Sequence, residues 1–260
     1  MNINVITARG NPKIKALKEL TGKASARRTA GLFVCDGVRL CRDAVLSGNQ
    51  IVSAFVTEKC REKYYSDIEE ILSNAENVYS VSEEIMNFVS DTVSPQGIIC
   101  TARTEKHSFC PQKNKKYIAL DGIQNPDNLG AVIRTAEALG IDGIIISGGC
   151  DIYNPKALRA SMGSVFRMPV VLTDRLSEKI KEYNGIGIST YASVVSGEAQ
   201  SLAQTDFSGG ALTVIGNEGN GVSEEVQNAC SGKITIVMKG RAESLNAAQA
   251  SSIIMWEMTK

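Results

Sequence analysis

The sequence predicts an α/β protein in which a smaller N-terminal α/β domain precedes a larger domain built on parallel strands. Apolar runs of strand length alternate with segments of helical periodicity along the chain. Three loops rich in glycine and asparagine follow such runs, at 121–130, 216–221 and 238–246. Because ligands bind at the carboxyl ends of parallel strands, the three loops indicate one shared pocket.

The bulk composition is that of an ordinary soluble globule. The chain has 260 residues, of which 43% are apolar and 22% are charged. No apolar run approaches the roughly 18 residues of a membrane span. The first residues are too short an apolar run for a signal peptide and are followed by basic residues. We therefore expect a cytoplasmic protein without a membrane partner.

Cysteine and histidine usage narrows the possible chemistry. The seven cysteines are an odd number without a C-x-x-C pair, which favours reduced thiols over disulfides or a zinc site. His107 is the only histidine and stands in a polar stretch, so a histidine-based metal site is excluded. Catalysis that depends on histidine is disfavoured for the same reason.

Charge is unevenly distributed although the whole chain is neutral. Residues 1–48 contain nine Lys or Arg against three acids, and 9 − 3 gives +6. Such a surface binds phosphate groups, although a merely solvated basic face remains an alternative at this point.

In the first hundred residues, periodicity predicts alternating helices and strands. Helices are expected over 12–20, 38–46, 66–74 and 83–89, and strands over 32–35, 51–56, 78–81 and 97–102. The segment 23–31 contains two adjacent arginines and no periodicity, which predicts an exposed basic loop. Residues 103–114 are polar and aperiodic, which indicates an interdomain linker.

The second part begins with a strand, loop, helix and strand over 117–147, the length of a βαβ unit. Asn128, or Asp127 before it, is expected to cap the helix, and Arg134 falls beside its apolar stripe. A capping box is expected around Ser223. The remaining expected strands cover 166–172, 187–192, 211–215 and 234–238, and the remaining helices cover 155–164, 175–183, 223–229 and 244–258.

The loop at 216–221 does not match the common nucleotide-binding motifs. It lacks the G-x-G-x-x-G spacing of a dinucleotide fingerprint and the closing G-K-[ST] of a phosphate loop. Glu218 within it would repel a phosphate group. The loop therefore indicates a ligand that is neutral or cationic at this point, such as one with an adenine edge read by backbone groups.

Taken together, the three loops resemble the motifs of the SpoU (TrmH-like) branch of the SPOUT RNA 2′-O-ribose methyltransferases. The similarity lies in Asn125-Pro126-x-Asn128-x-Gly130-x-x-x-Arg134, Gly216-Asn217-Glu218-Gly219 and Ser244-Leu245-Asn246. The N-terminal region is similar to the L30e-like substrate-binding domain of rRNA methyltransferases through Asn11-Pro12, the basic segment and Phe33-x-x-Asp36-Gly37-x-Arg39. Asp36 stands where that family usually has Glu, and Val237 where a proline is common.

The resemblance implies a fold and a cofactor. The expected domains are an L30e-like RNA-binding domain over 1–102, a linker over 103–114 and a trefoil-knotted SPOUT domain over 115–260. The methyl donor would be S-adenosylmethionine, and no metal is implied. Residues implied to bind the donor are Thr190, Ala192, Ile215, Gly216, Asn217, Gly219, Ile236, Met238, Ser244 and Leu245.

The resemblance also implies catalytic and RNA-binding residues in a homodimer whose active sites are completed across the interface. The catalytic set would be Asn128, Arg134, Glu218, Ser244 and Asn246, and the RNA-binding set Lys13, Lys15, Lys18, Arg27, Arg28 and Arg39. The implied reaction is methylation of a ribose 2′-oxygen, with 23S rRNA as the substrate. Alternatives are a tRNA 2′-O-methyltransferase and a non-catalytic RNA-binding or ribosome-assembly protein.

Overall fold

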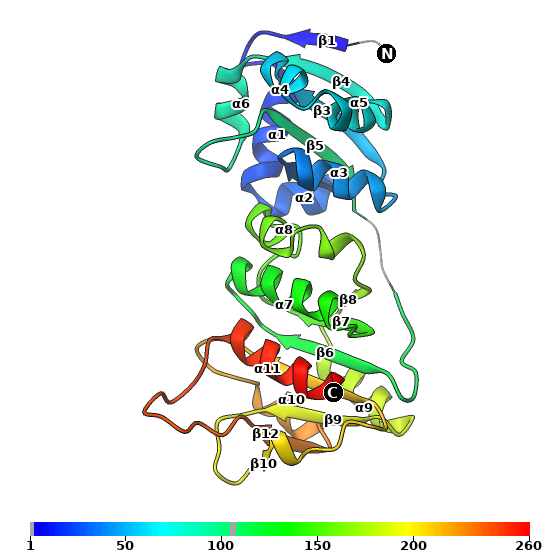
Figure 1. Cartoon of the computed structure of the whole chain (residues 1–260), viewed down its shortest axis with the longest axis vertical. Coiled ribbons are helices and arrows are strands. Elements are labelled where there is room, and N and C mark those ends of the chain that lie inside the picture. The colour runs from blue at the N-terminus through cyan, green and yellow to red at the C-terminus, as the bar shows by residue number, and fades with distance from the viewer. Residues whose placement is uncertain (1–2, 105–107) are drawn as a thin grey trace. The chain divides into compact units, whose positions relative to one another are not determined.

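The computed structural model describes residues 3–104 and 108–260, and the chain forms two compact units (Figure 1). The first unit comprises Met1–Glu105 together with Asp151–Phe166. The second unit comprises Lys106–Cys150 and Arg167–Lys260. His107 lies outside the described residues, so nothing follows for its predicted surroundings. Within the described ranges, none of the helices has the length and apolar character needed to span a membrane.

The first unit is built on a mixed five-stranded sheet in the order β1-β4-β3-β5-β2, in which β5 runs antiparallel to both of its neighbours. The strands are β1 Ile3–Ile6, β2 Leu32–Asp36, β3 Ile51–Val56, β4 Ala75–Val81 and β5 Ile98–Arg103. The helices are α1 Pro12–Gly22, α2 Ala24–Ala30, α3 Val38–Leu46, α4 Glu58–Lys63, α5 Tyr65–Ser73, α6 Glu83–Val89 and α8 Pro155–Ser161. The 3₁₀ turn η1, Ser164–Phe166, follows α8.

Helix α1 has the amphipathic pattern that the sequence predicts. Asn11 caps it by accepting a hydrogen bond from the Lys13 amide at 2.9 Å, and Pro12 occupies the first helical position. Ile14, Leu17 and Leu20 are buried in a core shared with β3, β4 and α6. The lysines between them stay exposed on the opposite face.

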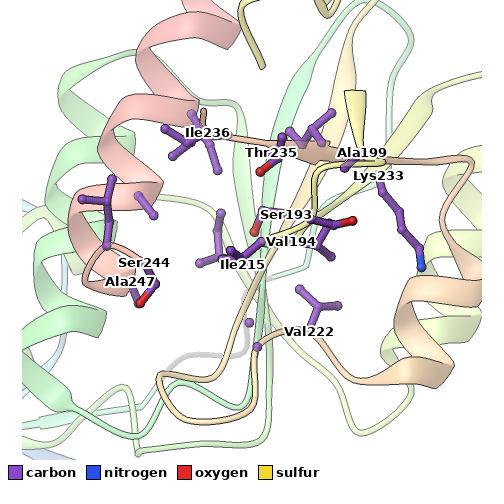
Figure 2. A pocket seen from close by; sticks show the side chains of 18 of the residues that line it. Ser193, Val194, Ala199, Ile215, Val222, Lys233, Thr235, Ile236, Ser244 and Ala247 are labelled. Carbon is purple, nitrogen blue, oxygen red and sulfur yellow. The ribbon is translucent and has the colours of Figure 1, made fainter. Parts of the chain in front are cut away.

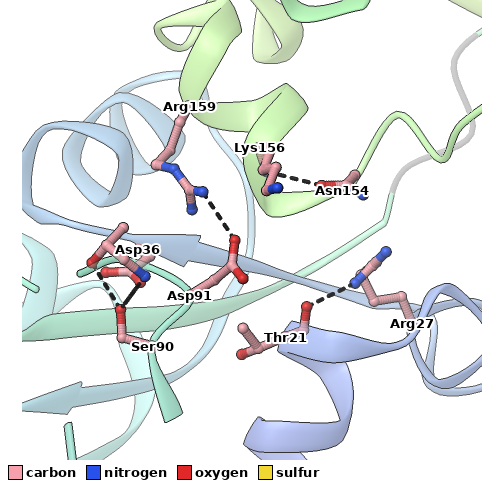
Figure 3. A network of polar contacts seen from close by, with 9 residues as sticks. Thr21, Arg27, Asp36, Ser90, Asp91, Asn154, Lys156 and Arg159 are labelled. Atoms are coloured by element: carbon pink, nitrogen blue, oxygen red, sulfur yellow. Dashed lines mark hydrogen bonds and ion pairs between the residues drawn. The ribbon is translucent and has the colours of Figure 1, made fainter. Parts of the chain in front are cut away.

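The prediction of an exposed basic loop at 23–31 is wrong, because this segment forms α2 and ends at Gly31, whose φ is +63°. Arg27 is only 3% exposed. Its Nε donates to Asp151 Oδ2 at 2.7 Å, and its Nη1 donates to the carbonyl of Leu20 at 2.7 Å and to that of Thr21 at 3.3 Å, the last of which is drawn in Figure 3. Arg27 therefore ties α2 to the end of α1 and to a residue 124 positions away, a contact that local sequence does not reveal.

Residues 151–166 pack within the first unit, although the predicted domain 115–260 was continuous. Phe33 of β2 stacks on Tyr153 with ring centroids 4.7 Å apart and on Phe166 at 5.7 Å. Arg159 of α8 pairs with Asp91 at 2.9 Å (Figure 3). The compact units therefore depart from the predicted boundaries at this segment.

The same polar network contains a buried carboxyl group. Asp36 is 7% exposed, and its Oδ2 accepts a hydrogen bond from the Ser90 hydroxyl at 2.5 Å. Burial raises the pKa of Asp36, against the lowering effects of this hydrogen bond and of the Arg159 guanidinium. Asp36 is thus satisfied inside the first unit and is not displayed to a ligand.

The second unit is a seven-stranded sheet in the order β10-β12-β9-β11-β6-β7-β8, and every assigned strand pair in it is parallel. Its strands are β6 Lys116–Asp121, β7 Gly143–Ser147, β8 Val170–Leu172, β9 Ser189–Ser193, β10 Gln200–Ser201, β11 Ala211–Gly216 and β12 Gly232–Thr235. Its helices are α7 Pro126–Ala138, α9 Leu176–Gly185, α10 Glu224–Ala229 and α11 Ala247–Thr259, with a 3₁₀ turn η2 at Leu202–Gln204.

The central strands β6, β7 and β11 of the second unit are buried on both faces, which explains why they are continuous apolar runs. Tyr117 and Ala119 of β6 point to one face and share a core with Ile180 of α9. Ile118 and Leu120 point to the opposite face and are fully buried. Helices α7 and α11 lie side by side (Figure 1) and contact β7, β6 and β11.

Several predicted boundaries in this unit shift. Asn125, not Asn128 or Asp127, caps α7, since its side chain accepts from the Asp127 amide at 2.8 Å. The Ser223 side chain makes no capping hydrogen bond to α10. Strand β12 ends at Thr235 and α11 starts at Ala247, so the intervening residues are an extended loop. The run 166–172 is a strand only from Val170.

Replacing Arg27 with methionine should lower the free energy of unfolding by about 3 kcal/mol, because Asp151 would be left without its buried partner. Arg28→Met is the matched control on the same helix, where an exposed side chain should contribute less than about 0.5 kcal/mol. Urea denaturation followed by circular dichroism measures both variants. Equal losses in the two variants would contradict a structural role for Arg27.

Candidate functional site

Two of the three predicted loops leave neighbouring strands at the same level. Strand β11 pairs with β6 in parallel, with Gly216 opposite Asp121. The loop after β6 and the glycine loop after β11 therefore start side by side at the carboxyl edge of the sheet. Asp121 Oδ2 also accepts a hydrogen bond from the Ser223 amide at 2.9 Å, which fixes the far end of the glycine loop.

Glu218 connects the glycine loop to the loop after β6. Its Oε1 accepts from Asn128 Nδ2 at 2.8 Å and from the Asn125 amide at 3.2 Å. Its Oε2 accepts from the Gln124 amide at 3.1 Å. Three donors, two from the loop after β6 and one from the first turn of α7, thus converge on a single carboxylate of the glycine loop.

The third loop, 238–246, is joined to the other two by hydrogen bonds of Asn246. Asn246 Nδ2 donates to Asn128 Oδ1 at 3.0 Å, and Asn246 Oδ1 accepts from the Ala248 amide at 2.9 Å as the N-cap of α11. Asn128 is 7% exposed, and both ends of its amide are used. Motifs that are 90 and 118 positions apart are therefore joined through one side chain.

The surroundings of Glu218 keep it ionised. Partial desolvation acts to raise the pKa of Glu218, but the hydrogen bonds from Asn128 and from the Gln124 and Asn125 amides outweigh it, so the pKa is lowered. A carboxylate whose pKa is depressed in this way accepts a further proton poorly. Glu218 is therefore suited to hold the two loops together.

The glycine loop is a closed turn. The Asn217 amide donates to the Gly221 carbonyl at 3.0 Å, and the Gly221 amide donates back to the Asn217 carbonyl at 2.9 Å. A Cβ on Gly216 would lie 2.0 Å from backbone atoms of Gly221 and Val222. Only glycine at 216 allows the turn to close this tightly.

A pocket of about 850 Å³ opens beside this turn (Figure 2). Apolar side chains from three directions form its walls, including Ile215 of β11, Ile236 after β12 and Ile254 of α11. The remaining lining residues include Ser193, Val194, Ser196, Glu198, Ala199, Leu202, Glu218, Val222, Gln227, Lys233, Ser244 and Ala247. Its volume lies within the range of small-molecule and cofactor sites.

Eight residues predicted to bind the donor line this pocket. They are Ile215, Gly216, Asn217, Gly219, Ile236, Met238, Ser244 and Leu245. Thr190 and Ala192 do not line it, because both are fully buried within β9. The Thr190 hydroxyl donates to Asn184 Oδ1 at 2.7 Å and accepts from the Ser231 amide at 2.9 Å.

The pocket uses the residues that follow β9 instead. Val194, Ser196 and Glu198 lie in the loop between β9 and β10 and line the pocket. Sequence reasoning missed this loop because it has neither glycine–asparagine motifs nor periodicity. The polar, small-residue run after the strand at 187–192 was the available signal.

The predicted catalytic residues fall into two groups. Glu218 and Ser244 line the pocket, and Asn128 and Asn246 are joined to Glu218 by hydrogen bonds. Arg134 lies on the exposed side of α7 and does not line the pocket. Among the described residues, Arg134 has neither a hydrogen-bond nor an ion-pair partner, so its guanidinium is available.

The predicted RNA-binding residues also divide. Lys13, Lys15 and Lys18 are exposed on α1, with Lys13 over the Tyr79 ring at 4.9 Å and Lys18 over the Phe88 ring at 5.4 Å. Arg28 and Arg39 are exposed too. Arg27 is buried and its guanidinium is occupied, so it offers no surface for RNA.

The residues present fit a sulfonium nucleoside donor. The apolar walls suit a purine, and within the described part of the chain the backbone of 237–245 makes no hydrogen bond, which leaves its donors and acceptors available. Charged lining residues are two carboxylates, Glu198 and Glu218, against Lys233, which favours a cationic ligand. No cluster of His, Cys, Asp or Glu suited to a metal ion occurs within 3–104 or 108–260.

The three motif loops on which the resemblance to SPOUT methyltransferases rests are thus joined at the carboxyl edge of a parallel sheet. The sequence profile described as the SpoU rRNA Methylase family matches residues 115–256, and that of an MRM3-like substrate binding domain matches residues 11–100. The chain belongs to the SpoU rRNA methylase family.

Relatives match along nearly the whole chain. The chain is 30% identical over 253 residues to the 23S rRNA (guanosine(2553)-2′-O)-methyltransferase RlmP of Bacillus subtilis, covering 95% of this chain and 96% of RlmP. It is 28% identical to an uncharacterised tRNA/rRNA methyltransferase of Synechocystis, covering 98% and 93%. An AdoMet-bound rRNA methyltransferase of Sinorhizobium meliloti superposes with a TM-score of 0.87 at 27% identity, covering 98% and 97%.

Replacing Glu218 with glutamine should loosen the loop after β6, because an amide places an NH₂ group against amide donors. We expect the Gln124 and Asn125 amides to exchange with deuterium about five times faster at pH 7, equivalent to roughly 1 kcal/mol for a partly exposed site. Glu224→Gln, on an exposed carboxylate of α10, is the control.

The same contact should depend on pH. The pKa of Glu218 is lowered in the folded protein. The stabilisation that its carboxylate gives to the loop after β6 is therefore present above the ordinary pKa of 4.5 and is lost as pH falls through the lower pKa of the folded state. Exchange of the two amides, corrected for intrinsic rates, should then approach that of Glu218→Gln. Unchanged protection in both tests would rule out this role of Glu218.

Proposed function

We propose that this chain transfers the methyl group of S-adenosylmethionine to a ribose 2′-oxygen of ribosomal RNA, with 23S rRNA as the substrate. The observation that carries the proposal is the convergence of Asn128, Glu218 and Asn246 beside the pocket. The methyltransferase RlmP, which matches the chain almost end to end, supports the 2′-oxygen and 23S rRNA. The proposal places the protein in the cytoplasm, where this RNA would be modified.

The pocket holds the donor and aligns it. Bound S-adenosylmethionine would supply an electrophilic methyl group on its sulfonium, and transfer to the 2′-hydroxyl would release S-adenosylhomocysteine and a proton. The apolar walls around Ile215 and Ile236 exclude water from the purine, and the free backbone groups of 237–245 offer hydrogen bonds to its edge. Fixing the methyl group in line with the attacking oxygen supplies several kcal/mol of the rate enhancement.

The two asparagines and Glu218 hold the geometry of the site. Asn128 has both amide ends occupied, so it fixes the start of α7 relative to α11. Glu218, whose pKa is lowered, is a poor acceptor for the 2′-hydroxyl proton. Ser244 is exposed at the pocket, and its hydroxyl makes no hydrogen bond to any described residue, so it can contact the ribose.

Arg134 is proposed to act on the RNA. A guanidinium offers hydrogen-bond donors and no acceptor, so it stabilises the developing 2′-oxyanion or holds the adjacent phosphate. Its exposed position outside the pocket of its own chain supports a role in the pocket of a second copy.

A homodimer is therefore part of the proposal. Helix α11, which packs beside α7, exposes Trp256 at 58% and Ile253 at 42%. Large apolar side chains exposed on a helix that packs against the helix of Arg134 suit contact with another protein surface. The lysines of α1 would hold the RNA through its phosphates, which supplies affinity without sequence information.

Purified protein should transfer tritium from methyl-labelled S-adenosylmethionine to rRNA, and the label should be recovered as a 2′-O-methylnucleoside. Arg134→Ala should reduce transfer by about a thousandfold, as for loss of a transition-state donor, while the Kd for S-adenosylmethionine changes less than about twofold. Arg175→Ala, on an exposed arginine of the same unit, should behave like the wild type.

Mixed dimers locate Arg134. Co-expression of Arg134→Ala chains with Gly216→Val chains, whose glycine turn cannot close around the added side chain, should restore transfer, because one pocket of each mixed dimer then has both an intact turn and Arg134. Label confined to tRNA or to a base would refute the proposed substrate or reaction. Failure of mixed dimers to regain transfer would place Arg134 in the pocket of its own chain.

A further inference from the structure

The pocket has two chemically different ends. One end is apolar and is formed at α11 and the segment before it, where Figure 2 shows Ile236, Ser244 and Ala247. The other end lies at the β9–β10 loop and β12, where the same view places Val194, Ala199 and Lys233. A ligand that fills both ends must carry an apolar group and a polar group.

The three charged side chains that line the pocket differ in how many hydrogen bonds they already make within the protein. Glu218 already accepts three hydrogen bonds. Glu198 and Lys233 are both exposed, and neither side chain makes a hydrogen bond or ion pair with any other described residue. They do not pair with each other, although both line the same pocket. One free anion and one free cation therefore remain for a ligand.

The backbone holds these two residues at neighbouring levels. Strands β10 and β12 run parallel, with Gln200 opposite Ile234. Glu198 comes two residues before Gln200, and Lys233 comes one residue before Ile234, so the two lie at nearly the same level on adjacent segments. The Val194 amide donates to the Ile234 carbonyl at 2.9 Å, which ties the start of the loop to β12. The Glu198 amide donates to Ser196 Oγ at 3.2 Å, which shapes the turn before β10.

We propose that Glu198 and Lys233 bind the zwitterionic amino-acid end of S-adenosylmethionine. Glu198 accepts hydrogen bonds from the α-ammonium group, and Lys233 donates to the α-carboxylate. A zwitterion is matched by one anion and one cation held apart, and hydrogen bonds between charged groups are stronger than neutral ones. The adenosine then occupies the apolar end, with the sulfonium between the two ends, near Glu218. This assignment rests on the proposed function.

Truncated ligands test the two contacts separately. 5′-Methylthioadenosine lacks the amino-acid end, and decarboxylated S-adenosylmethionine keeps the ammonium but lacks the carboxylate. Calorimetry should show that Glu198→Gln weakens S-adenosylmethionine and its decarboxylated form about tenfold, as for loss of a charged hydrogen bond, and 5′-methylthioadenosine less than about twofold. Lys233→Gln should weaken only S-adenosylmethionine, again about tenfold.

Two exposed residues of α9 provide controls for charge alone. Lys181→Gln and Glu182→Gln make the same charge changes away from the pocket and should leave all three affinities unchanged. Equal weakening of 5′-methylthioadenosine and S-adenosylmethionine, or no weakening of either, would overturn the assignment. A folded wild-type protein that binds no S-adenosylmethionine would instead overturn the proposed function itself.

Discussion

The site depends on one chain of side-chain hydrogen bonds, from Ala248 through Asn246 and Asn128 to Glu218. The order of donors and acceptors along it is fully determined. The Ala248 amide requires an oxygen from Asn246, so Asn246 presents its NH₂ group to the Asn128 oxygen. Asn128 then presents its own NH₂ group to Glu218, which as a carboxylate can only accept. Reversing one amide would break two contacts, so the three loops are held as a unit.

The parallel sheet makes this chain possible. Strands β6 and β11 are adjacent and in register, so their loops begin at the same level although about ninety residues separate them in sequence. The N-terminus of α11 is brought to the same edge, where Asn246 serves both as its cap and as a partner of Asn128. Holding the loops together and lining the pocket are thus separate roles, and Glu218 has both. Asn128 has the first role and Ser244 the second.

Periodicity correctly predicted helices and strands whose apolar spacing is visible in the nearby sequence. It failed where a contact with a residue far away in the sequence determines the structure. The bounds 38–46, 51–56 and 83–89 agree with α3, β3 and α6. Segment 23–31 was predicted as a loop because nothing nearby announces that Arg27 pairs with Asp151. The motifs identified most of the pocket, but Thr190 and Ala192 are strand-core residues and the β9–β10 loop takes their expected place. The placement of Glu198 and Lys233 at the same end of the pocket became visible only from the strand register of β10 and β12.

Ribose methylation of ribosomal RNA is the proposed role of the interlocked motifs. The most direct measurement is a map of 2′-O-methylation across rRNA and tRNA from cells with the protein, without it, and with only its Arg134→Ala form. We expect a ribose methylation in 23S rRNA to disappear without the protein, and the Arg134→Ala form to leave it absent. Identical maps in all three strains, or a loss confined to tRNA, would contradict this account.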